Sequence, residues 1–242
     1  MTELIQTVLE GQGITLDKEM IEKLSLYHAL LCQWNEKMDL TNVPNDEIPL
    51  KHYVDSILPL VRYDGLFPLN ASLIDVGTGA GLPGIPLAIA RPDMKFTLLD
   101  AQNKRCEFLN EAVRKTGLPN VEVLHMRAED GGRDKRLRER FDLAAARAVA
   151  PLNVLLEYLL PFVKTGGCAL AWKGPAAALE LDAAKKASVI LGGGQIDSME
   201  MKFADMSHVL IRAEKVQRTA SQYPRKSGTP GKNPLGGIVE RT

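Results

Sequence analysis

The chain has 242 residues, of which 45% are hydrophobic and 25% charged, and its formal net charge is zero. These values are typical of one large globular domain, alone or with a small extension. No stretch approaches the ~20 apolar residues of a membrane span, and the acidic N-terminus is unlike a secretion signal, so we expect a cytoplasmic protein without membrane contact. Three cysteines in apolar surroundings favour free buried thiols, and the absence of a metal-ligand pattern predicts no bound metal.

The zero net charge conceals an asymmetry along the chain. Residues 1–50 contain nine acidic and three basic side chains, whereas residues 212–242 contain seven basic and two acidic ones. A polyanionic partner would therefore approach the C-terminal side.

The first 66 residues read as helical. A short helix is predicted over 3–10, and a longer one begins after Asp17, a plausible N-cap. Apolar residues at helical spacing define the face of the longer helix that packs on the rest of the protein: Met20, Leu24, Tyr27, Leu31 and Trp34. The segment 34–41 ends this helix in a polar turn.

A histidine, an aspartate and a serine occur together in the helical run 52–56. His52, Asp55 and Ser56 invite comparison with a hydrolytic triad, but one helix cannot align nucleophile, base and orienting acid, and the chain has no GxSxG motif. We therefore interpret them as a hydrogen-bond cluster at a domain junction.

The stretch from Leu73 to Arg91 organises the chain. A short apolar run ends in Asp75, glycines follow at 77, 79, 81 and 84, and an apolar helical pattern comes next. This order predicts a buried parallel strand, a ligand-binding turn and a helix whose N-terminal N–H groups face the ligand. A second strand, 95–100, ends in Asp100, which would lie beside the turn and suits a ribose diol.

Two ligands compete for this turn. Residues 79–84 satisfy GxGxxG, the weak signature of a dinucleotide site. Asp75 instead favours S-adenosylmethionine, because a carboxylate two residues before Gly77 can face a methionine ammonium group but would repel a pyrophosphate.

The later part of the chain continues the alternation of helices and strands. Helices are predicted over 102–117, 151–162 and 176–191, an exposed helix over 131–140, a turn at 166–167, and strands over 121–124, 141–146, 168–172 and 207–216, the last in an antiparallel hairpin. The proline- and glycine-rich segment 223–235 is predicted to be flexible and without regular structure.

Several side chains are candidates for ligand contacts at the strand ends. The loop after the third strand, 125–130, is a place for an adenine. Arg147, at the end of the fourth strand, can hold a phosphate or a base carbonyl unless an acid such as Asp142 or Glu129 gives it a structural role. Basic residues that could contact phosphates, or simply be solvated, are Lys104, Arg105, Lys173, Arg225, Lys226 and Lys232.

Seven segments together resemble the glucose-inhibited division protein B family, which methylates N7 of a guanosine in small-subunit (16S) ribosomal RNA. They are WNEKMDLT (34–41), HYVDSI (52–57), DVGTGAGLPGIPLAI (75–89), LLDAQNKRCEFL (98–109), RAED (127–130), RAVA (147–150) and YPRKSGTPGKNPL (223–235). The chain departs from the family at Asp39, where asparagine is usual, and at Leu82, where phenylalanine is common.

The resemblance implies a Rossmann-like class I methyltransferase of the α/β class, with a mostly parallel seven-stranded sheet and helices on both faces. It implies residues 1–66 as a helical extension, 67–216 as the S-adenosylmethionine-binding core and 217–242 as a basic flexible segment. Within the core it implies that Gly77 and Leu82 contact the methionine side of the cofactor, and Gly79 of the same turn is a further predicted cofactor contact. Asp100, Ala101 and Gln102 would contact the ribose region, Ala128 and Glu129 the adenine, and Arg147 the cofactor or target base.

The predicted reaction needs few catalytic groups. Guanine N7 keeps a lone pair at neutral pH, so it can attack a sulfonium methyl group without losing a proton first. We therefore expect a monomeric enzyme that acts on small-subunit ribosomal RNA or a ribosomal particle. The alternatives are an NAD(P)-dependent oxidoreductase and a non-catalytic rRNA-binding or assembly protein.

Overall fold

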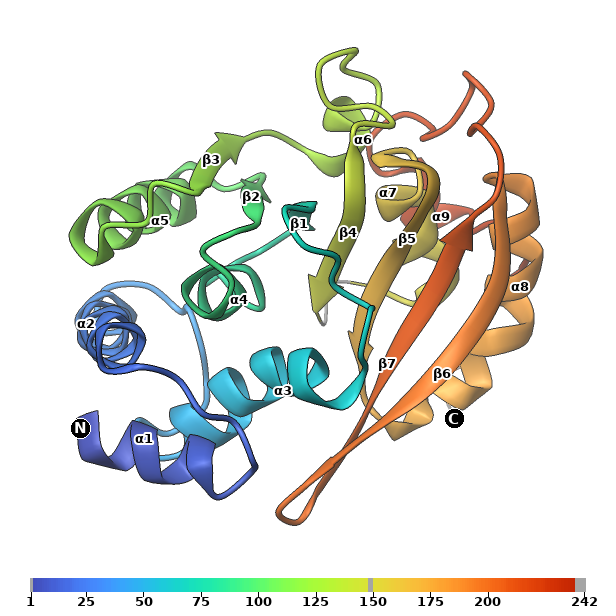
Figure 1. Ribbon diagram of the computed structural model, residues 1–242. Helices are drawn as coiled ribbons and strands as arrows, with labels where there is room; N and C mark the ends of the chain where they lie inside the picture. The colour runs from blue at the N-terminus through green and yellow to red at the C-terminus, as the bar shows by residue number, and fades with distance from the viewer. Residues whose placement is uncertain (1, 148–149, 238–242) are drawn as a thin grey trace.

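The computed structural model describes residues 2–147 and 150–237 and contains one seven-stranded sheet in the order β3-β2-β1-β4-β5-β7-β6 (Figure 1). The first five strands in this order are parallel, and β7 and β6 form an antiparallel edge. The strands are β1 (Ser72–Val76), β2 (Lys95–Asp100), β3 (Val121–His125), β4 (Phe141–Arg147), β5 (Val163–Lys173), β6 (Gly193–Phe203) and β7 (Met206–Lys215). The predicted α/β class, parallel sheet and closing hairpin are confirmed.

Helices cover both faces of the sheet (Figure 1). On one face lie α4 (Gly84–Ala90) and α5 (Asn103–Thr116), together with α1 (Thr2–Glu10), α2 (Lys18–Asn35) and α3 (Asp55–Arg62), which a π-helical segment Pro49–Val54 precedes. On the other face lie α7 (Leu152–Leu159) and α8 (Leu181–Ile190), which follows a 3₁₀ turn Pro175–Glu180. The short helices α6 (Ala128–Gly131) and α9 (Thr229–Lys232) lie near α7.

Alternation along the central strands divides the core into two layers. In β5, Leu170 and Trp172 belong to the cluster that the N-terminal helices cover, whereas Ala169 and Ala171 belong to the cluster under α7 and α8. This period of two is what a strand buried on both faces requires.

Helix α2 has the predicted N-cap and polar turn, and a hydrogen bond joins it to the sheet domain. Asp17 accepts a hydrogen bond from Met20 N–H at 2.8 Å and caps α2. The hydroxyl of Tyr27, fully buried, donates to the carbonyl oxygen of Ala80 in the glycine turn. Asn35 satisfies the polar turn after α2 by accepting from the N–H groups of Leu40 and Thr41.

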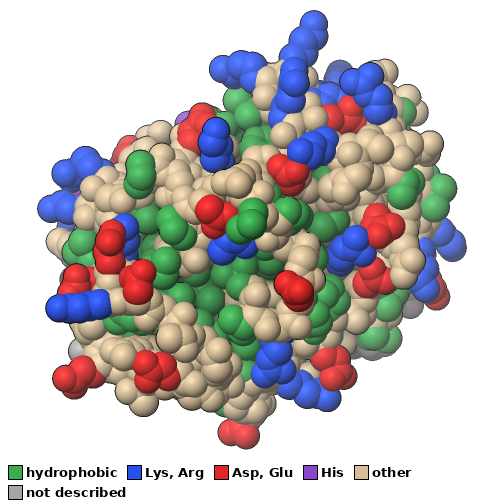
Figure 2. Space-filling view, viewed as in Figure 1, with side chains coloured by type: hydrophobic (Ala, Val, Ile, Leu, Met, Phe, Trp, Pro, Cys, Tyr) green, Lys and Arg blue, Asp and Glu red, His purple; other side chains and the backbone are tan. Residues whose placement is uncertain are grey.

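Two local predictions within the sheet domain are wrong. Most of residues 131–140 form turns instead of a helix, because Arg133 and Arg138 donate to backbone carbonyls of the C-terminal segment. Figure 2 shows basic side chains gathered at the top of the view, the end of the molecule at which α6 lies in Figure 1. Residues 166–167 lie inside β5 instead of in a separate turn, in the irregular stretch where β4 and β5 shift register. Gly166 has a φ of 90° there, and a side chain at Gly167 would collide with the carbonyl oxygen of Asp142.

The described part of the C-terminal segment, 217–237, packs against the sheet domain and includes the short helix α9. Arg225 pairs with the buried Glu157, Asn153 donates to the carbonyl oxygen of Leu235, and Pro230 is buried. The prediction that residues 223–235 lack regular structure is thus wrong at α9. Side chains of the sheet domain form hydrogen bonds with the backbone of this segment and hold it in place. Glu240 and Arg241, counted in the basic C-terminal balance, lie outside the described residues, as do positions 148–149 of the RAVA motif.

Candidate functional site

The glycine turn follows β1 at the carboxyl edge of the sheet. Gly77 and Gly79 have positive φ, and Gly77 N–H donates to the carbonyl oxygen of Leu99 in β2. Gly84 begins α4 so close to β1 that an added Cβ would collide with Leu98 and lie 2.8 Å from Oδ2 of Asp75. The glycines therefore allow the turn to fold over the strand ends.

The turn encloses a cavity of about 480 Å³, which we call the glycine-loop cavity. Its lining comprises Leu40, Thr41, His52, Gly77, Thr78, Gly79, Ala80, Leu82, Asp100, Ala101, Gln102, Arg105 and Arg147. Seven of the ten positions predicted to bind the cofactor are in this lining. A Cβ added at Gly79 would meet nothing closer than 4.0 Å, so this position leaves space for a ligand near the backbone.

Asp75 lies beneath the turn and is fully buried. Its Oδ2 accepts hydrogen bonds from the Thr78 hydroxyl at 2.6 Å and from Gly84 N–H at 2.9 Å. Among the residues that the structure describes, its Oδ1 has no hydrogen-bond partner, and burial raises the pKa of the carboxyl to about 6. A buried acceptor without a partner is rare, and Asp75, predicted to bind the cofactor, is itself absent from the lining of the glycine-loop cavity.

Asp100 is buried at the end of β2, as the sequence predicts. Its Oδ2 accepts from Gly79 N–H at 2.9 Å and its Oδ1 from Gln102 N–H at 2.9 Å, so it holds the turn as well as lining the cavity. The guanidinium of Arg105 lies 3.8 Å from Oδ2. Arg105, predicted to face a phosphate, thus lines the glycine-loop cavity.

Ala128 and Glu129, the predicted adenine contacts, are absent from the lining of this cavity. Glu129 is buried at α6, and its Oε1 accepts from Gly228 N–H at 2.9 Å. This carboxylate therefore holds the C-terminal segment against the domain in the structure described.

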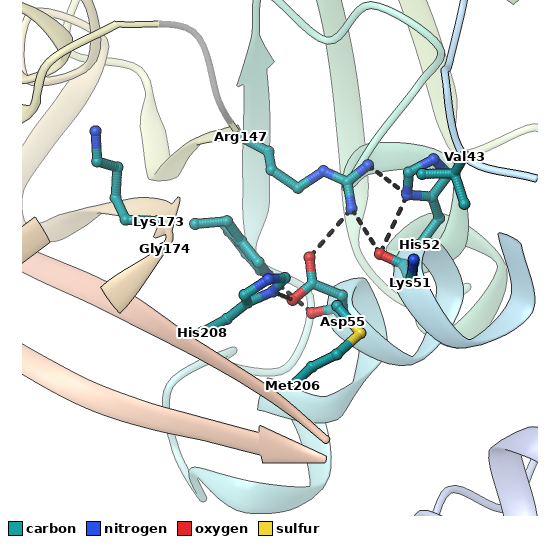
Figure 3. Close-up of a pocket in the computed structure, with 10 residues that line it drawn as sticks. Val43, Lys51, His52, Asp55, Arg147, Lys173, Gly174, Met206 and His208 are labelled. Atoms are coloured by element: carbon teal, nitrogen blue, oxygen red, sulfur yellow. Dashed lines mark hydrogen bonds and ion pairs between the residues drawn. The ribbon is translucent and has the colours of Figure 1, made fainter. Parts of the chain in front are cut away.

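Arg147 ends β4 and forms the centre of a polar network (Figure 3). One terminal nitrogen donates to Oδ2 of Asp55 at 3.1 Å, and the other lies 3.0 Å from Nδ1 of His52. The same Nδ1 lies 3.1 Å from the carbonyl oxygen of Lys51, and Nε2 bonds the Thr41 hydroxyl at 2.7 Å, so both ring nitrogens have partners. Burial, with Arg147 as the next cause, lowers the pKa of His52 to about 4, so it is neutral at pH 7.

A second cavity, of about 430 Å³, lies on the other side of this network. We call it the hairpin cavity because the β6–β7 hairpin forms one wall. Its lining comprises Val43, Lys51, His52, Asp55, Arg147, Trp172, Lys173, Gly174, Met206 and His208. His52 and Arg147 line both cavities and therefore stand between them.

Asp55 joins three parts of the fold in the hairpin cavity. Its Oδ1 accepts from Nδ1 of His208 in β7 at 2.8 Å, and its backbone carbonyl accepts from the indole N–H of Trp172 in β5. Asp55 is therefore the acid that pairs with Arg147. The two acids named from the sequence are engaged elsewhere: Asp142 pairs with Lys164, and Glu129 bonds the C-terminal segment.

The sequence did not single out His52, Asp55 or His208 as site residues. The first two carried a signal, the polar cluster at 52–56, and the rejection of a triad is confirmed because the Ser56 hydroxyl donates to the backbone oxygen of His52. His208 carried no signal, since only the folding of the hairpin brings it to Asp55.

The remaining basic candidates occupy different environments. Lys104, Lys226 and Lys232 are exposed. Lys173 pairs with Glu180 at 2.8 Å and donates to the carbonyl oxygen of Ala150, and it points away from Arg147 (Figure 3). Arg225 forms a bidentate pair with Glu157, so its guanidinium is committed within the protein.

Within residues 2–147 and 150–237, no three His, Cys, Asp or Glu side chains are grouped so that they could hold a metal ion. Over the same residues, no helix is long and apolar enough to cross a membrane.

Solved structures with the same arrangement of strands and helices define the class. A predicted O-methyltransferase from Agrobacterium tumefaciens aligns with a TM-score of 0.52 and 18% identity, over 68% of this chain and 81% of that one. An antibiotic-resistance methyltransferase aligns with a TM-score of 0.50 and 20% identity, over 62% and 90%. The fold is thus the Rossmann-like fold of methyltransferases.

The chain belongs to the rRNA small subunit methyltransferase G family, whose model matches residues 20–210. The protein named ribosomal RNA small subunit methyltransferase G of Acetivibrio thermocellus is 47% identical over 230 residues, which are 93% of each chain. That of Clostridium beijerinckii is 45% identical over 236 residues, 96% of this chain and 98% of the relative. The resemblance to the glucose-inhibited division protein B family is confirmed, and the protein is an rRNA methyltransferase. Family and fold imply the use of S-adenosylmethionine.

Proposed function

We propose that the protein transfers a methyl group from S-adenosylmethionine to N7 of a guanosine in 16S ribosomal RNA. The observation that carries this proposal is the position of Arg147, which stands between a cavity suited to the cofactor and a second cavity. The relatives at 41–47% identity, all named for small-subunit rRNA methylation, support the RNA substrate.

The glycine-loop cavity would hold the cofactor. Oδ1 of Asp75 would accept from the ammonium group, and the backbone at Gly77, Gly79 and Leu82 would contact the methionine side. Asp100, Ala101 and Gln102 at the end of β2 would contact the ribose. Ala128 and Glu129 remain proposed for the adenine on the position of their loop after β3 and on the family resemblance.

The chain's own residues have a limited chemical task. The cofactor supplies an electrophilic methyl group, and guanine N7 attacks it directly as the carbon–sulfur bond breaks and S-adenosylhomocysteine leaves. No proton has to be removed, which agrees with a neutral His52 that is already bonded on both ring nitrogens. The protein must align N7 with the methyl carbon, and such alignment contributes several kcal/mol to the barrier reduction. Arg147, fixed by Asp55 and His52, is the group proposed to orient the base.

We propose three regions with different tasks. Residues 1–66 supply His52 and Asp55 to the site, 67–216 bind the cofactor, and 217–242 contact RNA phosphates. Lys104, Lys226 and Lys232 are the proposed phosphate contacts because they are exposed, whereas Lys173 and Arg225 are already paired within the protein. Because one chain builds both cavities, we propose a monomer, acting in the cytoplasm where ribosomal RNA is found.

The test is transfer of labelled methyl from S-adenosylmethionine to small-subunit rRNA and to small-subunit particles, followed by digestion and identification of the labelled nucleoside. N7-methylguanosine is the expected product. Label at another atom would overturn the N7 proposal. Cofactor binding without transfer to any RNA would favour a binding or assembly role, and protection by NADH instead of S-adenosylhomocysteine would favour an oxidoreductase.

The RNA contacts are tested by substituting Lys226 and Lys232 together by glutamine. Loss of two phosphate contacts should reduce the slope of log affinity against log salt by about 0.7 per contact on single-stranded RNA, with cofactor affinity unchanged. An unchanged slope would contradict this role.

A further inference from the structure

The hairpin cavity has the size and composition of a site for a nucleobase. Its volume of about 430 Å³ is within the range of small-ligand pockets. Val43, Trp172 and Met206 give it apolar surface, which suits the faces of a planar ring. Its charged groups are three cations, Lys51, Arg147 and Lys173, and, among the described lining residues, a single carboxylate, Asp55. The cavity shares the Arg147–His52 wall with the glycine-loop cavity, so its occupant would lie beside the proposed cofactor site.

We propose that the hairpin cavity receives the target guanine and that Asp55 selects guanine over other bases by accepting hydrogen bonds from its N1–H and 2-amino groups. This inference rests on the proposed function, because it takes N7 as the reacting atom. In guanine, N7 and O6 are acceptors on one edge of the base, and the 2-amino group is a donor on the other. A base that offers N7 to the methyl group therefore needs an acceptor for its donor edge.

Asp55 has the capacity for these bonds although it is already paired. A carboxylate accepts about four hydrogen bonds, and Asp55 receives one at Oδ2 from Arg147 and one at Oδ1 from His208. By this count of lone pairs, one acceptor position remains on each oxygen. Arg147 and His208, which approach from β4 and β7, fix the carboxylate plane from two sides.

The charge pattern disfavours adenine. Adenine presents an acceptor at N1 and carries no 2-amino group, so it would leave the carboxylate unpaired and set a lone pair against it. Arg147 supplies a donor for a carbonyl such as O6. The described lining thus pairs an acceptor, Asp55, and a donor, Arg147, with the pattern of guanine.

The experiment compares RNA carrying guanosine at the mapped target position with RNA carrying inosine there. Inosine keeps N7, O6 and N1–H but lacks the 2-amino group. For the unmodified protein we expect kcat/KM to fall roughly tenfold or more on inosine, as for loss of a hydrogen bond to a charged group. Equal rates on the two RNAs would overturn the proposal.

The Asp55→Asn variant separates base reading from a structural role. We expect it to be slower on guanosine RNA and to have lost most of the inosine penalty, because the partner of the 2-amino group is gone. A variant that is slow on both RNAs but keeps the full penalty would show that Asp55 only positions Arg147, and the proposal would be wrong. Any change that inosine makes to RNA structure or to N7 reactivity affects both proteins equally.

The control is Asp142→Asn, the same change of aspartate to asparagine. Asp142 lies near the start of β4, at the other end of that strand from Arg147, and its carboxylate pairs with Lys164 and Ser72. This variant should keep the full inosine penalty. Calorimetry with S-adenosylhomocysteine shows whether Asp55→Asn still folds and binds cofactor. The proposed function fails if the unmodified protein forms no N7-methylguanosine, whereas the present inference fails if N7-methylguanosine forms but inosine carries no Asp55-dependent penalty.

Discussion

The two cavities share one wall but are built differently. Most of the glycine-loop cavity comes from residues 77–105, at the ends of two adjacent parallel strands. The hairpin cavity combines residues 43–55 of the N-terminal extension with the ends of β4 and β5 and with the β6–β7 hairpin. The first is therefore fixed by a local motif, and the second by the way distant elements pack.

Their charges differ as well. Asp75 and Asp100 are the buried carboxylates beneath and beside the glycine turn, which suits a cationic methionine end and a ribose. The hairpin cavity has one carboxylate among its described lining residues, Asp55, and three cationic side chains, Lys51, Arg147 and Lys173. This difference predicts that cofactor binding and base positioning can be disturbed separately.

The largest expected effect is at the shared wall. In Arg147→Lys the charge remains, but a single ammonium cannot bond Asp55 and His52 in the fixed fork of a guanidinium. We expect methyl transfer to fall by about 10²–10³-fold, as for removal of a positioned donor. The affinity for S-adenosylhomocysteine should change little, because Asp75, Asp100 and the glycine turn are intact. Rates come from transfer of labelled methyl, and affinities from calorimetry.

An equal loss of methyl transfer and of cofactor affinity would contradict the separate roles of the two cavities, since Arg147 would then belong to the cofactor site. Arg136→Lys is the control, because Arg136 is exposed and pairs only with Asp134. It should leave both quantities unchanged.

The second expected effect is a pH dependence of cofactor affinity, which arises in the glycine-loop cavity. The pKa of Asp75 is raised to about 6 by burial, so the carboxylate that would meet an ammonium group becomes protonated below that pH. Affinity for S-adenosylhomocysteine should fall about tenfold from pH 7 to pH 5. His52, with its pKa lowered to about 4, stays neutral over this range and does not contribute.

The free energy of unfolding should rise between pH 7 and pH 5, whereas the cofactor affinity falls. The folded protein holds a proton on Asp75 at a higher pH than the unfolded chain, so this group destabilises the fold as pH rises from about 4 to 6. Without ligand, its share makes the protein roughly 1 kcal/mol more stable at pH 5 than at pH 7. Asp75→Asn should remove both dependences; a variant with the same pH profile as the parent would contradict the assignment.

The difference between the cavities also explains what the sequence could predict. Asp75, Gly79 and Asp100 could be assigned because strand, turn and helix are contiguous, and parallel strands end at the same edge. The position of Arg147 followed from the same rule. Its partner did not, because Asp55 is 92 residues earlier in the chain and no periodicity links the two.

The errors in the fold have a similar origin. Residues 131–140 contain charges of both signs, as an exposed helix would, but tertiary contacts of Arg133 and Arg138 decide their conformation. At Gly167 the glycine marks a close approach of β4 and β5, and glycine alone does not distinguish this from a turn. In both places a long-range contact overrides the local pattern.

A third prediction uses two glycines with nearly the same backbone. Gly79 and Gly117 have φ of 60° and 62°, and an added Cβ has no close contact at either position. Each substitution by alanine should cost about 1–2 kcal/mol of stability, because alanine resists this conformation. Only Gly79→Ala should also lower cofactor affinity several-fold, since its new methyl group projects beside the glycine-loop cavity. Thermal melts and calorimetry measure the two quantities, and similar affinity losses at both sites would contradict the assignment of this cavity.

The smallest effect tests whether the N-terminal extension also supports the cofactor side. The buried hydroxyl of Tyr27 donates to the carbonyl oxygen of Ala80 in the glycine turn, whereas that of Tyr53, on the same side of the sheet, bonds His28. Both Tyr27→Phe and Tyr53→Phe should cost about 1 kcal/mol of stability, because each leaves a buried polar atom without its partner. Tyr27→Phe alone should weaken cofactor binding, by roughly twofold, because only its hydroxyl restrains the turn. Equal affinities in the two variants would confine the influence of the extension to the hairpin cavity, and the two cavities would then be independent apart from the wall formed by His52 and Arg147.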